Sequence, residues 1–423
     1  MNYILFDGQY RDALLPLTYT RPVSEIRLGI FTIREKWEMF TGTTITNLTE
    51  DYLSHKFPMV EFSDNIMING AYLPNEDIMS IIEKMSSNQA IFDNDIVVSF
   101  RVSNTQDSVD FDSLNKLKCP ESVLRIKNLF DIYRLNGEAI NSDFELLIKN
   151  KNSQPIPDGT QYINEELIFI EEGAKLPFCT LNASDGPIYI GKNSEIMEGS
   201  LIRGPFAICE NSIVKMGAKI YGSTTIGPYC KVGGEVSNSV FFGYSNKGHD
   251  GFLGNSVIGE WCNSGADTNT SNLKNNYANV KLWNYESESF INTNLQFCGL
   301  VLGDYSKCGI NTMFNTGTVV GVFANIFGSG FPRNFVPSFS WGGNKGFSTY
   351  LTKKAFEAAS IVMERRGCEF SDKDAEILKE VFEISKKYRS SYWDFFTLLR
   401  FNRFIGFDPR LVTLLLTNLI ASS

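Results

Sequence analysis

Two histidines occur among the 423 residues of the chain, and one of them, His249, stands in a polar stretch between Lys247 and Asp250. An imidazole titrates near neutral pH, so it is well suited to remove a proton from a nucleophile that must react as a free base. In a chain with two histidines, this placement favours a catalytic role for His249, and Lys247 and Asp250 beside it are candidate contacts to a polar substrate. The alternative is a structural histidine that bonds neighbouring elements. His55 lacks such a context and is expected at the surface.

Two further hexads follow, the first of which ends at Asn263, and then a second polar stretch, residues 269–279, contains Lys274 and several asparagines. So polar a run cannot pack inside an apolar core, because buried polar groups need hydrogen-bond partners. We expect either a protruding loop or the lining of a polar ligand site. Asn263 and Lys274 are therefore candidate substrate contacts.

The elements that must hold these residues are indicated by a period of six. Every sixth residue from Ile190 to Val232 is Ile or Val, and the period returns between Leu302 and Ile326. Neither an α-helix nor an ordinary strand produces a strict six, whereas a hexapeptide β-helix does. We expect short strands stacked in triangular coils, with function where the period is interrupted, around His249.

The length of the chain allows two or three domains. We expect an α/β domain over residues 1–150, a linker and lead-in over 151–187, a left-handed parallel β-helix over 188–345 and a helical tail over 346–423. Ser371 is expected to cap one tail helix at its start. Gly367 is expected at the end of the helix before it.

Composition argues against several classes of partner. The formal net charge is −9 and the pI is near 5.1, whereas nucleic-acid-binding domains usually carry basic patches. The chain has no run of 18 or more apolar residues, so no membrane-spanning helix is expected. Its eight cysteines show no C-x-x-C pair, which predicts reduced thiols in a cytoplasmic protein.

The first residues contain another candidate site. A strand is predicted over residues 3–6, followed by a loop that contains Gly8 and Arg11, and then a helix over residues 26–40. After a strand of an α/β sheet, such a loop can present backbone N–H groups and a cation to phosphates. Gly8 and Arg11 are equally compatible with a turn residue and a surface charge.

The segment that begins at Gly8 reads G-x-x-R-x-x-x-L-P-L-T-x-x-x-P. It resembles the signature loop of the sugar nucleotidyltransferases, which join a sugar 1-phosphate to a nucleoside triphosphate. The resemblance implies that Gly8 approaches the triphosphate, that Arg11 stabilises charge developing on it, and that Mg²⁺ takes part. Two family positions differ. The lysine position is Val23, for which Arg21 and Arg27 are candidate substitutes. The metal-binding aspartate position is Ala71, for which Asp7 and Asp64 are candidate replacements.

The interrupted part of the repeat resembles the acyltransferase half of a bifunctional family that combines sugar nucleotidyl transfer with hexapeptide-repeat acyl transfer. The matching segments are residues 248–255, 263–268 and 271–273. The resemblance implies acyl transfer from acetyl-CoA or another acyl-CoA to an amino-sugar phosphate. His249 would act as the base and Asn272 as a catalytic contact to the sugar or oxyanion, in a homotrimer.

Both resemblances point to a transferase of nucleotide-sugar metabolism that acts on sugar phosphates and nucleotides. An alternative also follows from the sequence. In it, the chain is a non-catalytic or single-site protein whose N-terminal domain binds a nucleotide sugar and whose β-helix only trimerises it.

Overall fold

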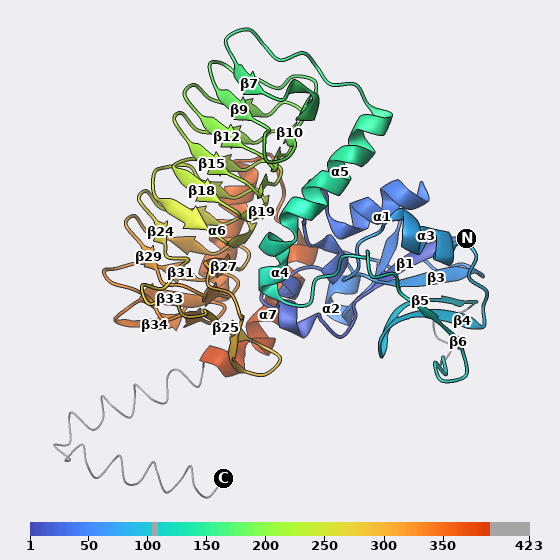
Figure 1. Cartoon of the computed structure of the whole chain (residues 1–423). Coiled ribbons are helices and arrows are strands. Elements are labelled where there is room, and N and C mark those ends of the chain that lie inside the picture. Colours follow the sequence, from blue (N-terminus) through green and yellow to red (C-terminus); the bar gives the residue numbers. More distant parts are fainter. Residues whose placement is uncertain (104–108, 390–423) are drawn as a thin grey trace, which may run out of the picture.

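The computed structural model describes residues 1–103 and 109–389. Figure 1 shows an α/β domain beside a column of stacked strands, with two helices from the C-terminal part of the chain at their junction. The column is a parallel β-helix of about 10 turns. The predicted fold class is confirmed in its α/β domain, its parallel β-helix and the helices that follow the β-helix.

The N-terminal domain is built on a six-stranded sheet with the order β2-β1-β3-β5-β4-β6. Its strands are β1 (Asn2–Phe6), β2 (Thr46–Leu48), β3 (Asn65–Asn69), β4 (Gln89–Asp93), β5 (Ile96–Val102) and β6 (Asn115–Lys118). β1 runs parallel to β2 and β3, and β5 runs antiparallel to β3. Every residue of β3 is buried, as expected for a strand covered on both faces. The predicted first strand corresponds to β1.

Helices and tight turns cover this sheet. They are η1 (Asp12–Leu14), η2 (Leu17–Tyr19), η3 (Val23–Glu25), α1 (Ile33–Thr41), α2 (Asp51–Ser54), α3 (Glu76–Ile82), α4 (Leu129–Arg134) and α5 (Asn136–Asn150). The helix predicted over residues 26–40 begins only at Ile33, because Gly29 has a φ of +78° and Thr32 caps the helix. The Thr32 hydroxyl accepts a hydrogen bond from the Glu35 N–H, and the Glu35 carboxylate accepts one from the Thr32 N–H. Residues 26–32 form a mostly buried loop instead.

The β-helix has three sheets, one on each side of its coil, and their strands are parallel except for the antiparallel pair β33–β34 at the end of one sheet. We call them the docked face, the cavity face and the third face. The docked face contains β8 (Ile168–Ile170), β10 (Ile188–Ile190), β13 (Phe206–Ile208), β16 (Thr224–Ile226), β19 (Val240–Gly243), β22 (Val257–Glu260), β27 (Leu300–Leu302), β30 (Thr318–Val320) and β32 (Phe335–Val336).

The cavity face contains β11 (Glu195–Ile196), β14 (Ile213–Val214), β17 (Lys231–Val232), β20 (Asn246–Lys247), β23 (Asn263–Ser264), β28 (Lys307–Cys308), β31 (Asn325–Ile326), β33 (Ser340–Gly343) and β34 (Gly346–Thr349). The third face contains β7 (Gln161–Ile163), β9 (Thr180–Asn182), β12 (Leu201–Arg203), β15 (Lys219–Tyr221), β18 (Glu235–Ser237) and β21 (Phe252–Gly254). The remaining elements are η4 (Glu165–Leu167), the parallel pair β24 (Asn269–Thr270) and β29 (Met313–Phe314), and the hairpin β25 (Lys281–Asn284) and β26 (Ser289–Asn292).

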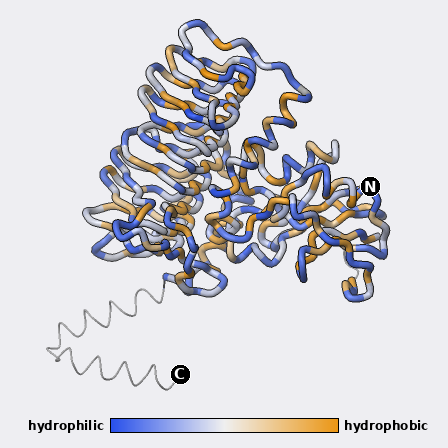
Figure 2. The backbone as a smooth tube through the Cα atoms, in the orientation of Figure 1, coloured by the Kyte–Doolittle hydropathy of each residue, from blue (hydrophilic) through white to orange (hydrophobic). Residues whose placement is uncertain are grey.

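The branched residues at every sixth position form the interior of the column. Ile190, Ile208 and Ile226 are stacked in register on successive strands, and all three are fully buried. Adjacent strands lie roughly 4.8 Å apart, so these side chains contact one another along the column. Figure 2 shows hydrophobic residues recurring from coil to coil. The period of six therefore corresponds to a continuous apolar core.

The coils begin earlier than the predicted boundary at residue 188. β8 pairs in register with β10, and β9 pairs in register with β12. The lead-in segment supplies apolar residues for the interior, such as Ile168, Ile170 and Leu181. It therefore forms a coil of its own instead of only leading to the first one.

The N-terminal domain covers the docked face along much of its length (Figure 1). β10, β13 and β16 are buried at every residue, whereas β12 and β15 on the third face alternate between exposed and buried residues. Ile140 and Phe144 of α5 form a buried cluster with Tyr189 and Ala207 of the docked face. The outward side chains of this face thus belong to a core shared with the N-terminal domain.

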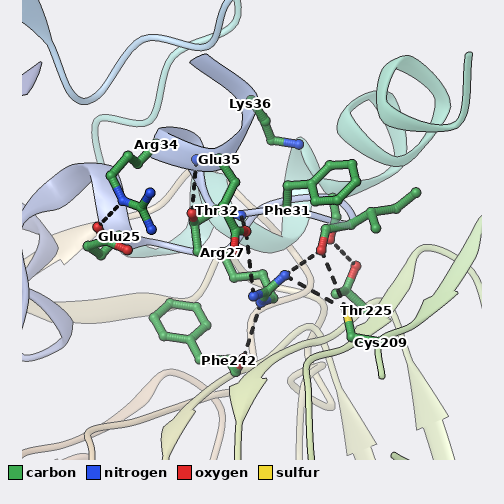
Figure 3. A network of polar contacts seen from close by, with 12 residues as sticks. Glu25, Arg27, Phe31, Thr32, Arg34, Glu35, Lys36, Cys209, Thr225 and Phe242 are labelled. Carbon is green, nitrogen blue, oxygen red and sulfur yellow. Dashed lines mark hydrogen bonds and ion pairs between the residues drawn. The ribbon is translucent and has the colours of Figure 1, made fainter. Parts of the chain in front are cut away.

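Polar bonds also fix this junction (Figure 3). The buried Arg27 side chain donates from Nε to the carbonyl oxygen of Phe242, at 3.2 Å, and from Nη1 to that of Ile30. The Thr225 hydroxyl, on the docked face, donates to the carbonyl oxygen of Gly29 at 2.9 Å. Buried carbonyl groups need such donors. The loop of residues 26–32 therefore depends on the β-helix for part of its hydrogen bonding.

Two C-terminal helices, α6 (Thr352–Glu364) and α7 (Asp372–Ile384), pack near the junction. The predicted caps are present. The Ser371 side chain accepts a hydrogen bond from the Asp374 N–H, and Gly367 has a φ of +69°. The rest of the predicted helical tail, residues 390–423, lies outside the described residues. In the described ranges no helix has the length and apolar character needed to cross a membrane.

Candidate active site

The cavity face carries a hollow of about 750 Å³ next to the C-terminal end of α6. We call it the cationic cavity. Its floor consists of outward-facing residues of four successive strands, β17, β20, β23 and β28. The lining residues are Lys215, Lys231, Tyr244, Asn246, Gly248, His249, Trp261, Cys262, Asn263, Ser264, Gly265, Ala266, Lys307, Ile310, Val362, Arg365 and Arg366.

Positive charge dominates this lining, in the side chains of Lys215, Lys231, Lys307, Arg365 and Arg366. None of the described residues that line the cavity is an aspartate or a glutamate. Burial, and then the guanidinium of Arg366, lower the pKa of Lys231, and burial lowers the pKa of Lys307. Such cations gain stability when an anion binds among them. The cavity is therefore chemically suited to a phosphorylated ligand.

Arg366 holds the end of α6 against the strands. Its guanidinium donates to the Tyr229 carbonyl oxygen at 2.9 Å and to Asn246 Oδ1 at 2.8 Å. Guanidinium groups can make several such bonds in a fixed geometry. Arg366 thus fixes the cavity wall in place while its charge remains at the cavity.

Stacked aromatic rings form another part of the wall. Tyr229, Tyr244 and Trp261 stack with ring centroids 4.8 and 4.3 Å apart, and the latter two rings line the cavity. Each ring follows a glycine by one or two residues at the same corner of successive coils. Sequence reasoning missed this wall, although the recurrent spacing of glycine and aromatic residue could have revealed it.

His249 stands at the rim of the cationic cavity, on the corner formed by residues 248–251, and it is exposed. In the preceding coil, the corresponding corner between strands has two residues, Gly233 and Gly234, whereas the His249 corner has four. A Cβ at Gly234 would lie 2.8 Å from the carbonyl oxygen of Gly251, so the His249 corner rests directly on glycine backbone. A proton acceptor is thereby held at an accessible position beside a cationic pocket.

Lys247, predicted as a substrate contact, does not face the cavity. It occupies an inward position in register with Val232 and is only 3% exposed. Its amine donates to the carbonyl oxygens of Gly233, at 3.0 Å, and His249, at 2.9 Å. Side chains alternate along a strand, so Asn246 points outward and Lys247 inward. The prediction of a substrate contact is therefore corrected.

Asn263 and Asp250 lie near His249 in different ways. Asn263 faces outward from β23 and lines the cationic cavity, and its Oδ1 accepts a hydrogen bond from Asn246 at 3.4 Å. Asp250 is exposed on the His249 corner, outside the lining, and its carbonyl oxygen accepts a hydrogen bond from the Asp267 N–H. Of the predicted substrate contacts, the structure thus brings Asn263 into one cavity with His249.

Asn272 and Lys274 lie away from the cationic cavity. Asn272 donates from Nδ2 to Asn255 Oδ1 at 2.8 Å, and Lys274 donates from Nζ to the carbonyl oxygen of Asn279 at 3.0 Å. Lys274 lines a second cavity of about 910 Å³, together with Trp283 of β25. A joint catalytic role for Asn272 and His249 requires the two side chains to lie side by side. Within a single chain they do not.

The predicted phosphate loop near the N-terminus carries an arginine whose charge is already balanced. Arg11 lies close to three carboxylates, those of Asp7 at 3.5 Å, Asp12 at 3.3 Å and Glu50 at 3.7 Å. Gly8 packs against Asn69, because a Cβ there would lie 2.4 Å from the Asn69 amide nitrogen. Carboxylates around an arginine weaken its attraction for phosphate. This loop is thus poorly suited to receive a triphosphate.

Arg21 is buried where the N-terminal domain meets the β-helix. Its guanidinium pairs with Asp304 and, at 3.3 Å, with Glu260, and it lies over the ring of Phe242 at 5.0 Å. Burial acts to lower the pKa of Arg21, but the charges of Asp304 and Glu260 raise it. The prediction that Arg21 contacts a nucleotide is therefore corrected, because residues of the β-helix neutralise its charge.

The residues of the N-terminal domain do not fit a magnesium site. Ala71 stands at the family's aspartate position, offers no side-chain oxygen and is fully buried. Asp64 pairs with Arg101 at 2.6 Å, and the Asp7 carboxylate accepts a hydrogen bond from Thr49 at 2.6 Å. Within the described ranges, no group of three His, Cys, Asp or Glu residues is arranged to hold a metal ion. Mg²⁺ prefers several oxygen ligands, so we derive no step through it.

Comparison with known proteins agrees with both halves of the sequence analysis. Residues 3–152 match the family model described as sugar nucleotidyl transferase. The proteins named Bifunctional protein GlmU from Synechococcus elongatus and from a second Synechococcus strain are each 29% identical over 224 residues. The chain resembles the bifunctional nucleotidyltransferase and acyltransferase family. That resemblance is the one predicted from the sequence, and it is confirmed.

The extent of these matches is limited. The matched segment covers 48% of this chain and 45% of each GlmU protein, so the chain spans about half the length of the curated relatives it matches. Among solved structures, the polysialic-acid-specific acetyltransferase NeuO is 15% identical with a TM-score of 0.22, over 44% of this chain and 87% of that one. Arabidopsis UDP-N-acetylglucosamine acyltransferase is 15% identical with a TM-score of 0.24, over 50% and 80%. We draw nothing further from these structures.

Proposed function

We propose that this protein is a transferase of nucleotide-sugar metabolism. It would move an acyl group from acetyl-CoA or another acyl-CoA to an amino-sugar phosphate or a related nucleotide sugar. The observation that carries the proposal is the cationic cavity with His249 at its rim. The matches to sugar nucleotidyl transferases and to GlmU support the class of substrate.

The chain's own residues suggest how such a transfer would proceed. Lys231, Lys307 and Arg365 would hold the phosphates of the donor, because the described lining offers them no carboxylate. A bound CoA thioester supplies an activated acyl group. His249 would accept the proton that the acceptor nitrogen loses as its bond to the acyl carbon forms. It would return that proton to the sulfur as the carbon–sulfur bond breaks.

A homotrimer is part of this proposal. Phe178, Met216 and Ile310 are 71%, 69% and 70% exposed, and they lie along the same edge of the β-helix as His249. Large apolar side chains gathered on one edge favour burial against another molecule. Contact between copies along this edge would bring a neighbouring chain close to the His249 corner.

We also propose a cytoplasmic location. All eight cysteines are free thiols, and seven of them are buried. Free thiols in this number are typical of a reducing compartment.

A second candidate function concerns the N-terminal domain alone. Ala71 and the balanced charge of Arg11 favour a domain that binds a nucleotide sugar without transferring a nucleotidyl group. Pyrophosphate release from each nucleoside triphosphate, with Mg²⁺ and a panel of sugar 1-phosphates, tests this. Turnover with any pair would overturn the binding role, and its absence would support it.

The acyl transfer is tested by the release of free thiol from acetyl-CoA in the presence of glucosamine 1-phosphate and other amino-sugar phosphates. We expect His249→Ala to lower the rate by about 100-fold or more. His55→Ala is the matched control and should retain the wild-type rate. Thiol release that survives His249→Ala unchanged would remove His249 from the chemistry.

A further inference from the structure

A charged side chain inside the apolar column of the β-helix is a costly arrangement. On the cavity face, the inward position held by Lys247 is held by Val214 and Val232 in the two preceding coils and by Cys308 and Ile326 in later ones. Burying an ammonium group there costs free energy unless its hydrogen bonds are made. A lysine at this position therefore needs a specific role.

The bonds of Lys247 join two successive corners of the column. Its amine donates to the carbonyl oxygen of Gly233, on the shortened corner, and to that of His249, on the corner above. The shortened corner has no side chain that could support its neighbour, since both of its residues are glycines. Lys247 supplies that support from inside the coil.

We propose that Lys247 is a positioning residue for His249, whose amine ties the His249 corner to the glycine corner beneath it and so fixes the imidazole at the rim of the cationic cavity. The proposal rests on the proposed role of His249 as the base. The side chain of Lys247 is not part of the cavity lining, so its effect on turnover must pass through the corner to which it bonds.

The charged and titratable groups around Lys247 agree with this role. Asp250 on the same corner, Asp267 on the next corner and the Cys308 thiol in the interior face it. Both carboxylates are exposed at the surface, so neither is a buried partner for the amine. The two carbonyl oxygens are its hydrogen-bonding partners, and they determine where it holds the chain.

The test compares Lys247→Met with wild type, because methionine keeps an unbranched apolar chain without the donor. Lys219→Met is the matched control, since Lys219 is a surface residue that forms an exposed pair with Glu235 at 3.7 Å. Acetyl-CoA-dependent thiol release gives kcat and KM. The ring signals of the two histidines in an NMR spectrum report on the His249 corner, with His55 as an internal reference.

We expect Lys247→Met to lower kcat by roughly 10- to 100-fold, because a displaced imidazole is no longer positioned to accept the proton of the acceptor nitrogen. KM for acetyl-CoA should change by less than about 2-fold, because the cationic side chains are intact. The His249 ring signal should shift or broaden while the His55 signal stays in place. Lys219→Met should change none of these.

A fall in thermal stability with unchanged kcat and an unmoved His249 signal would overturn the proposal, since Lys247 would then be only structural. If Lys247→Met does not fold, Lys247→Gln, which keeps an N–H donor, is measured in the same way. If wild type releases no thiol with any acceptor, the proposed function fails. The NMR comparison still decides whether Lys247 positions this corner.

Discussion

The cations of the N-terminal loop and those of the cationic cavity have similar chemistry and different surroundings. Arg11 lies within 3.7 Å of three carboxylates, and Arg21 pairs with Asp304 and Glu260 across the domain junction. The five cations of the cavity are neighbours of one another, and the described lining has no carboxylate. The loop resembles a phosphate-binding motif, yet carboxylates surround its arginine, whereas the described lining of the cationic cavity combines five cations without one.

This difference shows how one kind of residue serves two purposes. Arg21, paired with the buried Asp304, links the two domains, and removing either partner would leave an uncompensated buried charge. Positive charge that lacks such partners is held in place by the fold and is available to a ligand. The surroundings of a cation therefore indicate its role better than the motif in which it occurs.

The largest expected effect is the loss of stability when Arg21, the cation that is paired across the domain junction, is removed. Arg21→Ala leaves the Asp304 carboxylate, which is 2% exposed, without its cation. We expect the free energy of unfolding to fall by roughly 3–5 kcal/mol, measured by urea denaturation. Arg203→Ala removes a surface pair with Asp185 and should cost less than about 1 kcal/mol. Equal losses in the two variants would contradict a stabilising role for Arg21.

Lys247 is an intermediate case, a buried cation that bonds to carbonyl oxygens. Burial lowers its pKa to about 8 from an ordinary value of 10.5. Between these two pH values the unfolded chain binds the proton more tightly than the folded chain does. The free energy of unfolding of wild type should therefore rise with pH in this window, by at most about 3 kcal/mol relative to Lys247→Met. Urea denaturation of both proteins between pH 8 and 10.5 checks this. The same dependence of the free energy of unfolding on pH in wild type and in Lys247→Met would contradict it.

Replacing Lys231, a cation of the cavity, should lower the affinity for CoA without lowering the stability of the fold. Lys231→Met should weaken CoA binding about 10-fold, or ~1.4 kcal/mol, measured by isothermal titration calorimetry. The thermal midpoint should stay the same or rise, because the positive charges of Arg366, Lys215 and Arg365 no longer repel a lysine there. Lys219→Met on the third face is the control, with unchanged CoA affinity. A loss of stability with unchanged affinity would assign Lys231 to the fold.

The smallest effect is expected from replacing Arg11, in the N-terminal loop that resembles a phosphate-binding motif. Arg11→Gln should change the affinity for a nucleoside triphosphate by less than about 2-fold, because the charge of Arg11 is already balanced by its neighbours. Fluorescence titration with a labelled nucleotide measures this. A loss of 10-fold or more would show that the loop binds phosphate after all.

The sequence predicts the column well because each coil repeats a local rule. Ile190, Ile208 and Ile226 need only their own spacing to be assigned to the interior. His249 could be chosen because it lies where this period is interrupted, and Asn263 could be chosen because it begins a segment that resembles the acyltransferases. Lys247 was wrongly predicted as a substrate contact because the prediction considered its polar neighbours in the sequence. It did not consider the alternation of side chains along a strand, which places Lys247 on the inside of the coil.

The rest of the site depends on contacts between distant segments. Arg365 and Arg366 reach the cavity because the C-terminal end of α6 lies beside it, and no local pattern indicates where a helix will pack. Arg21 was assigned to a ligand because its partner Asp304 lies 283 residues away in the sequence. Such pairings follow from packing of the whole chain, which spacing alone does not contain.

We propose that this protein binds anions in the cationic cavity of the β-helix. Isothermal titration of wild type and of the double variant Lys231→Met/Lys307→Met with CoA tests it most directly. We predict that wild type binds CoA and that the double variant binds it at least 50-fold more weakly, as expected for the loss of two charged contacts. Equal binding by the two proteins would contradict the account.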